Sequence, residues 1–190
     1  WLGQHVSRRG DHEDNLGLGM YPTDEPFFRA RLCASCHVGT GGKSVIHRIY
    51  GAGHPRLVFE LDTYSANQPA HYRVDSDYKL RKTHSNGLKL WAFGQVASAS
   101  FMLERLSDVQ YSRDGMFPEL SLFDCHACHR SITQTNAAAR GTRAKRPGVP
   151  RLNDSSLIML GILTNFLCYR LVCTGWSFCA SFFPRIFYWR

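Results

Sequence analysis

Two copies of one short motif constrain this chain of 190 residues more than any other feature. Residues 33–37 read C-x-x-C-H, and residues 125–129 repeat the pattern. This spacing is typical of c-type haem attachment, in which two thiols add to the vinyl groups of the porphyrin and the adjacent histidine reaches the iron as an axial ligand. The predicted thioether anchors are Cys33, Cys36, Cys125 and Cys128, and the predicted proximal ligands of two haems c are His37 and His129.

Two other chemistries use paired cysteines. The four motif cysteines could form a four-thiolate zinc site. Such a site does not require a histidine directly after each second cysteine, and the gap of almost ninety residues between the pairs is long for a zinc module. A redox dithiol would explain one C-x-x-C but not its repetition. Haem attachment is therefore favoured, with a structural zinc protein as an alternative.

The remaining histidines are candidates for the second axial position of each iron. His47 and His54 stand out because they follow the first motif closely, and His54 lies between a glycine and a proline. His126 lies inside the second motif and is expected to face away from the iron that His129 holds. Methionine is another possible axial ligand, but the helical spacing around Met102 favours a position in the core.

Composition excludes several classes of protein. With 44% hydrophobic and 20% charged residues, the chain has an ordinary globular composition, which excludes intrinsic disorder and collagen-like repeats. The formal net charge of +8 indicates an acidic partner. The basic stretch 140–151 has neither an aromatic platform nor a nucleic-acid-binding motif, so a solvated loop is expected there and no nucleic-acid partner. Two haems would add about four carboxylates and reduce the net charge to about +4, which favours an acidic redox protein as the partner.

Helical patterns dominate the chain, and no convincing series of strands is visible. Asn86 is a good N-cap, and apolar residues then recur with a period of 3.6 at Leu88, Trp91, Ala92, Val96, Ala99, Met102, Leu103 and Leu106. Small residues over 94–100 would let something flat or bulky approach this helix. A second helix is predicted from about Pro118 through His129. The fold class is therefore mainly α.

The C-terminal tail has an unusual composition. Residues 155–190 contain no Asp, Glu or Lys and are rich in aromatic residues and cysteine. Three interpretations follow: a buried core helix over about 157–167 with an irregular end, a membrane-associated segment, or a tail that is not the native continuation. The tail also holds the three cysteines that lie outside the motifs, so the odd number of cysteines does not indicate an intermolecular disulfide.

Several blocks of sequence resemble a known family. The first motif, His47, A-G-H-P-R-L at 52–57 and F-E-L at 59–61 resemble the periplasmic multihaem c-type cytochromes. They are most similar to the tetrahaem family that includes the electron acceptor of hydroxylamine oxidoreductase. W-A-F-G-Q at 91–95 and P-E-L at 118–120, with the second motif, are similar to later blocks of its larger relatives. The resemblance covers about residues 1–155.

The resemblance carries further expectations. Family members usually have another C-x-x-C-H motif just upstream of a W-L-x-x-H segment, and here Trp1, Leu2 and His5 match only that segment. This implies a fragment that begins just after a haem site, and it makes His5 a third candidate distal ligand. The implied architecture is a multihaem cytochrome c domain over 1–155, with helices and long loops wrapped around covalent haems, followed by the apolar tail 156–190.

These observations predict an electron carrier rather than an enzyme. Covalent haem attachment implies a periplasmic or other extracytoplasmic location, where the chain would serve a redox chain. The alternatives are a haem oxidoreductase that acts on a small nitrogen or sulfur compound at an open iron, and the structural zinc protein. The tail leaves membrane association as a further expectation.

Overall fold

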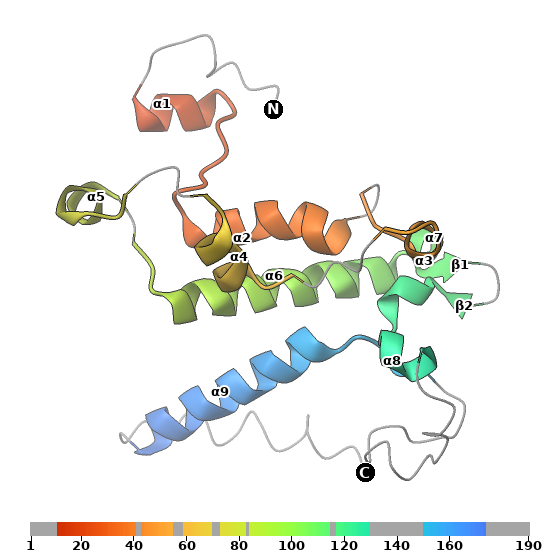
Figure 1. Ribbon diagram of the computed structural model, residues 1–190. Helices are drawn as coiled ribbons and strands as arrows, with labels where there is room; N and C mark the ends of the chain where they lie inside the picture. The colour runs from red at the N-terminus through yellow and green to blue at the C-terminus, as the bar shows by residue number, and fades with distance from the viewer. Residues whose placement is uncertain are drawn as a thin grey trace.

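The computed structural model describes residues 11–40, 43–54, 59–69, 73–82, 84–114, 117–129 and 150–173, and this part of the chain is mainly helical, as the sequence predicts. The longest helix, α6 (Gly87–Ser107), lies in the middle of the molecule (Figure 1). Helices α2 (Pro26–Ala34) and α4 (Leu61–Asn67) pack on one side of α6, and α9 (Ser155–Cys173) contacts it from the other. The described chain is thus built around α6.

The other elements are short. The remaining helices are α1 (His12–Gly17), α3 (His47–Gly51), α5 (Ser76–Arg81), α7 (Val109–Ser112) and α8 (Cys125–Cys128). A π-helical turn η2 (Ser35–Gly39) continues α2, and a 3-10 turn η3 (Leu120–Leu122) precedes α8. Strands β1 (Arg113–Asp114) and β2 (Phe117–Pro118) form one small antiparallel pair. The first C-x-x-C-H motif lies at the end of α2 and in η2, and the second lies in α8 and at its C-cap.

Helix α6 begins where the sequence predicts but buries a different face. The side chain of Asn86 caps it by accepting a hydrogen bond from the Lys89 N–H at 2.8 Å. Of the predicted apolar positions only Ala99 is buried, whereas Leu88 and Val96 are exposed. The buried positions of α6 are Leu90, Gly94, Ala97, Ala99, Phe101 and Arg105. The apolar repeat therefore does not coincide with the buried face, because α2 and α4 pack against α6 at Ala97 and Gly94.

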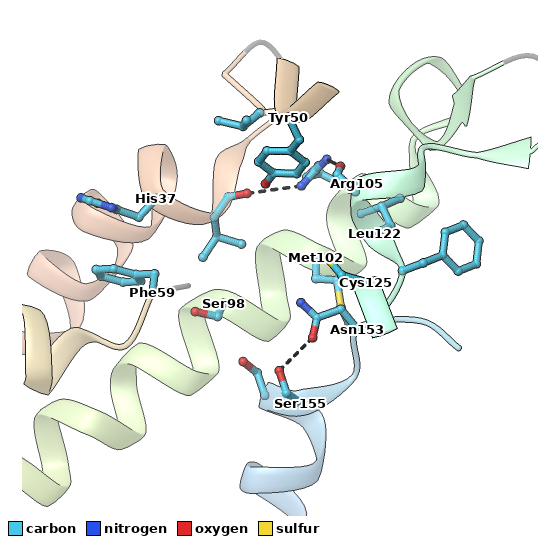
Figure 2. A pocket seen from close by; sticks show the side chains of 15 residues that line it. His37, Tyr50, Phe59, Ser98, Met102, Arg105, Leu122, Cys125, Asn153 and Ser155 are labelled. Atoms are coloured by element: carbon cyan, nitrogen blue, oxygen red, sulfur yellow. Dashed lines mark hydrogen bonds between the residues drawn. The ribbon is translucent and has the colours of Figure 1, made fainter. Parts of the chain in front are cut away.

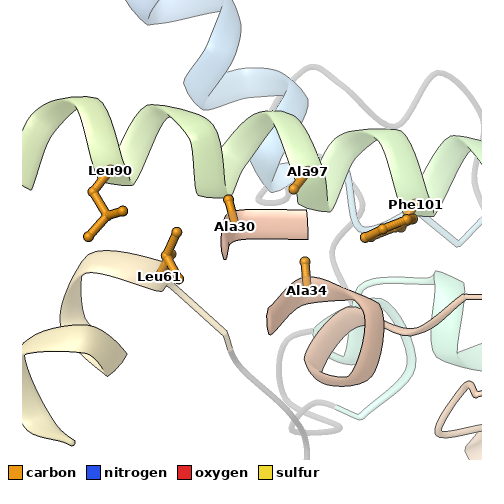
Figure 3. Close-up of a cluster of buried hydrophobic side chains, with 6 residues drawn as sticks. All are labelled: Ala30, Ala34, Leu61, Leu90, Ala97 and Phe101. Carbon is orange, nitrogen blue, oxygen red and sulfur yellow. The ribbon is translucent and has the colours of Figure 1, made fainter. Parts of the chain in front are cut away.

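The core forms where small residues of two helices meet (Figure 3). Ala30 and Ala34 of α2 and Ala97 of α6 are fully buried. Leu61 of α4 is 2% exposed, and its Cβ lies so close to α6 that a Cβ added at Gly94 would be only 2.8 Å away. The core cluster comprises Ala30, Ala34, Leu61, Leu90, Ala97 and Phe101. The small residues of α6 thus allow α2 and α4 to pack closely against it. The sequence alone did not identify which element would approach these residues.

Gly94→Ala is expected to destabilise the protein by about 1 to 2 kcal/mol. The added methyl group would gain up to about 1 kcal/mol of helix propensity, but overpacking against a rigid Cβ typically costs about 1 to 3 kcal/mol. Denaturant unfolding of the intact chain measures the difference. Gly17→Ala is the matched control, since a Cβ there meets nothing within 4 Å. Equal stability of the two variants would contradict the close packing of α4 on α6.

The segment before the second motif is not the single helix that the sequence predicts. Strand β2, turn η3 and helix α8 replace it. The break has a local cause: the side chains of Glu119 and Asp124 accept hydrogen bonds from the N–H groups of Ser121 and His126, so each begins a new turn. Phe123 also pairs with Leu152 as an isolated β-bridge. The prediction of a helix over about 118–129 was therefore wrong.

The tail is helical over a longer stretch than predicted, and it is not buried. Helix α9 continues to Cys173, and none of its described side chains is buried. The exposed apolar residues of this helix include Leu157, Met159, Ile162, Phe166 and Leu167. The prediction of a buried core helix over 157–167 was therefore wrong.

In the described residues, no helix combines the length and apolarity that membrane crossing requires. The candidate ligand His5 and residues 174–190 lie outside the described part of the chain.

Candidate functional site

The first C-x-x-C-H motif spans the junction between α2 and η2. Because residues three and four apart share a helix face, this conformation presents Cys33, Cys36 and His37 on neighbouring surface positions. Cys33 is half-buried and packs against the core cluster, whereas Cys36 is exposed. Neither is in a disulfide. Burial raises the pKa of the Cys33 thiol, and the nearby Arg29 cation opposes the shift only in part. Both sulfurs are therefore available for covalent attachment.

The second motif forms the single turn α8. Asp124 begins this turn through its hydrogen bond from the His126 N–H at 3.2 Å. The turn closes when the His129 N–H donates to the Cys125 carbonyl at 2.7 Å. As in the first motif, the leading cysteine is half-buried and Cys128 is exposed, and neither forms a disulfide. The two motifs therefore share one pattern of burial, in which the first cysteine is half-buried and the second is exposed.

His37 lies in an aromatic cluster. Its imidazole stacks on the ring of Phe59, with centroids 4.7 Å apart and planes inclined by 16°. Tyr64 of α4 meets His37 edge-on at 5.3 Å and Phe59 at 5.0 Å. Stacking covers a face of the imidazole, while a metal binds at a nitrogen on the ring edge. The cluster thus restricts the orientation of the His37 ring.

His129 faces a second histidine. The rings of His47 and His129 have centroids 6.2 Å apart and planes inclined by 31°. When two imidazoles bind one metal from opposite sides, their centroids lie about 6 Å apart, because each metal–nitrogen bond is about 2 Å and each centroid lies about 1 Å behind its nitrogen. The separation of His47 and His129 matches this value. Of the two predicted distal ligands in the described part of the chain, His47 and His54, the geometry therefore favours His47.

Glu119 holds His47 in this position. Its carboxylate is 4% exposed and accepts a hydrogen bond from the His47 backbone N–H at 2.6 Å. The same oxygen accepts from the Ser121 N–H at 3.1 Å. One buried side chain thus ties the start of α3 to the turn that leads into the second motif. The sequence alone assigned Glu119 no functional role, although it lies in the P-E-L block at 118–120.

Glu119→Ala is expected to destabilise the protein by about 2 to 3 kcal/mol, since hydrogen bonds to charged groups contribute about 1.5 to 3 kcal/mol. Glu119→Gln keeps one acceptor oxygen and is expected to lose about half as much. Amide hydrogen exchange provides the measurement, with the largest increase expected over residues 47–51. If the increase were uniform over all helices in Glu119→Ala, the specific role of Glu119 in docking α3 would be refuted.

A cavity of about 150 Å³ lies between the two motifs (Figure 2). His37 and Phe59 lie on one side, and Met102, Cys125 and Asn153 lie on another. Met102, which the sequence placed in the core, lines this cavity instead. The volume is below the roughly 300 to 1,000 Å³ typical of pockets for drug-sized ligands. The cavity can therefore admit an edge or a substituent of a porphyrin, but not the whole ring.

Arg105 of α6 lines the same cavity and is 7% exposed. Its guanidinium donates to the Val38 carbonyl at 3.3 Å and to the Ser121 hydroxyl at 3.1 Å, so it joins the segments that carry the two motifs. Its buried Nε has no hydrogen-bond partner. Burial lowers the pKa of Arg105, although the negative charge of Glu119 opposes this shift. The sequence did not identify Arg105 as a candidate site residue, because the apolar repeat of α6 does not distinguish it from other charged residues.

The other candidates are placed less favourably. His54 is exposed and follows Gly53, whose φ of +103° ends the α3 region. Its ring lies 6.3 Å from that of Tyr50, and it faces neither motif histidine within the described contacts. His126 is exposed, as predicted. In the described part of the chain, no three His, Cys, Asp or Glu side chains come together as a metal site. The four motif cysteines thus do not form the four-thiolate cluster that the zinc alternative requires.

The described residues fit haem better than a bare metal ion. The donor set comprises two pairs of unlinked thiols, each followed by an imidazole, and the cavity between them contains a buried cation with an unused N–H group. Comparison of the chain with protein-family models, curated proteins and solved structures finds no match.

Proposed function

We propose that this chain is an electron-transfer protein that carries two covalent c-type haems, one on each C-x-x-C-H motif. The observation that carries this proposal is the repetition of the complete motif on two helical turns whose thiols are not in disulfides. A zinc site or a redox dithiol would not require the histidine after each pair. Haem, when bound, supplies a one-electron Fe(III)/Fe(II) couple.

The chain would contribute attachment, axial ligation and shielding from water. Cys33 and Cys36 would anchor one porphyrin, and His37 would bind its iron. Cys125 and Cys128 would anchor the other, and His129 and His47 would supply imidazole ligands to its iron. An iron with two imidazole ligands has no open position, which favours outer-sphere electron transfer over bond chemistry. The family resemblance supports this interpretation, with the helices and loops wrapped around the haems.

The proposal includes a location and a partner. Covalent attachment through two thiols places the protein in a periplasmic or other extracytoplasmic redox chain. The basic chain, partly neutralised by haem carboxylates, favours an acidic redox protein as its partner. Encounter with such a partner would be steered by charge and would slow as ionic strength rises.

One observation favours a second candidate function at the first motif. Phe59 and Tyr64 surround His37, and in the described residues no other histidine ring contacts it. If His5 does not supply the second ligand, that iron would keep an open position. The chain would then be a haem oxidoreductase for a small nitrogen or sulfur compound.

Spectroscopy of the haem-loaded chain distinguishes the two functions. The electron carrier is expected to be fully low-spin, and its spectrum should not change with nitrite, hydroxylamine or cyanide. A high-spin component that responds to these compounds would establish the oxidoreductase instead. Cys33→Ala with Cys36→Ala, which removes the first haem, should abolish that response if the open iron lies there.

A further inference from the structure

We infer that Arg105 binds a haem propionate in the cavity between the two motifs. This inference rests on the proposed function, because the carboxylate belongs to a haem attached at one of the motifs. It begins from an unused donor: Nε of Arg105 is buried without a hydrogen-bond partner, and the side chain lines the cavity. A buried polar group without a partner costs about 1 to 3 kcal/mol, and more when it is charged.

In the described part of the chain, the neighbours of Arg105 leave its Nε donor without an acceptor. Its two hydrogen bonds go to a backbone carbonyl and a hydroxyl, both uncharged. The negative charge of Glu119 acts on Arg105, but in the described contacts the Glu119 carboxylate accepts hydrogen bonds from His47 and Ser121 and none from the guanidinium. In the described part of the chain, no ion pair includes Arg105. A carboxylate in the cavity would supply the acceptor that the unused Nε lacks.

The size of the cavity identifies the kind of anion. About 150 Å³ excludes a whole porphyrin but admits a carboxylate on its edge. A guanidinium carries five N–H donors in a planar fork that matches a carboxylate, and Arg105 uses two of its own in the described contacts. Both motifs border the cavity, through His37 and Cys125, so the propionate can come from either haem.

The variants Arg105→Met and Arg105→Lys test the inference in the haem-loaded protein. We expect Arg105→Met to shift the propionate bending band in the resonance Raman spectrum and to lower the reduction potential of one haem, because an unpaired carboxylate stabilises the oxidised iron. Arg105→Lys should restore most of the potential. The matched control is Arg31→Met, which removes a cation that lies over Phe101 at 4.9 Å and does not line the cavity.

Two double variants identify the haem that provides the propionate. Arg105→Met is repeated with Cys33→Ala and Cys36→Ala, and separately with Cys125→Ala and Cys128→Ala. The shift should vanish in the background that lacks the relevant haem and persist in the other. Circular dichroism shows whether each variant keeps its helices. If Arg105→Met does not fold, a crystal structure of the loaded wild type decides: a propionate hydrogen-bonded to Arg105 supports the inference, and its absence overturns it.

The remaining outcomes separate the two proposals. Two attached haems, with an unchanged Raman band and potential in Arg105→Met, would overturn the role of Arg105 and leave the electron-transfer proposal intact. Equal shifts in Arg105→Met and Arg31→Met would also overturn it, since the effect would then be one of charge at a distance. Absence of covalent haem in the wild type would overturn both proposals.

Discussion

Replacing Cys125 and Cys128 together by alanine is expected to halve the haem content of the loaded protein. Each porphyrin is attached through two thioethers, so a motif without thiols cannot retain haem through denaturation. The remaining haem should sit on Cys33 and Cys36. Intact mass spectrometry and the pyridine haemochrome spectrum measure the loss, from two haems per chain to one. The double variant Cys33→Ala, Cys36→Ala should give the same ratio.

The second motif offers a control within four residues. His126 and His129 are both exposed histidines of this motif, but only His129 follows the second cysteine directly. His126→Ala should keep two haems and an unchanged spectrum, whereas His129→Ala should lose the normal ligation of one iron. If both histidine variants behaved alike, or if the cysteine variants kept two haems, attachment at this motif would be refuted.

Replacing His47 by alanine is expected to convert one haem from low-spin to high-spin and to let it bind carbon monoxide or cyanide. The reason is geometric: the His47 and His129 rings are separated by 6.2 Å, which suits two imidazoles on one iron. His47→Met should restore a six-coordinate iron with a higher reduction potential, because a thioether ligand favours the reduced state relative to a second imidazole. Absorption and electron paramagnetic resonance spectra of the loaded variants measure both effects.

His54→Ala is the matched control for this variant. His54 lies near the other end of the α3 region, and its ring neighbour is Tyr50 rather than a motif histidine. It should keep both haems low-spin. The opposite result, with an open iron in His54→Ala and none in His47→Ala, would reverse the assignment of the distal ligand. Cys125→Ala with Cys128→Ala should remove the high-spin signal from the His47 variant, because the affected haem is then missing.

Local signals predicted several elements correctly. The Asn86 side chain begins α6 as expected, since an N-cap depends on residues within one turn. The sequence at 45–50, followed by Gly51 and Gly53, also favours a short helix, and α3 ends at Gly51. These features depend on nearby sequence alone, which explains why they could be predicted without knowledge of the packing.

Features that depend on distant residues could not be predicted. The buried face of α6 is set by Ala30 and Ala34 of α2 and by Leu61 of α4, which select Gly94 and Ala97 as contacts. Hydrophobic periodicity pointed to larger residues that remain exposed. The predicted helix before the second motif is interrupted by local hydrogen bonds to Glu119 and Asp124, and Glu119 adds a contact with a distant segment. Glu119 bonds to His47, which lies 72 residues away, and so fixes a turn there.

Some residues of the candidate site could be predicted from the sequence, and others could be identified only from the fold. The anchors and proximal ligands follow from the motif, since the chemistry needs those residues at adjacent positions. The preference for His47 over His54 required the ring geometry at His129. Arg105 was invisible to sequence reasoning because its significance comes from burial, an unused Nε and a cavity that two distant segments enclose. His5 stays a prediction from the family resemblance.

Haem content of the wild-type chain tests the central claim most directly. The chain is produced with a cytochrome c maturation system, denatured and analysed by intact mass and by its pyridine haemochrome spectrum. We expect a mass increase equal to two haems that survives denaturation, together with a matching haemochrome absorbance. An unmodified mass with stoichiometric zinc and no Soret band would contradict it.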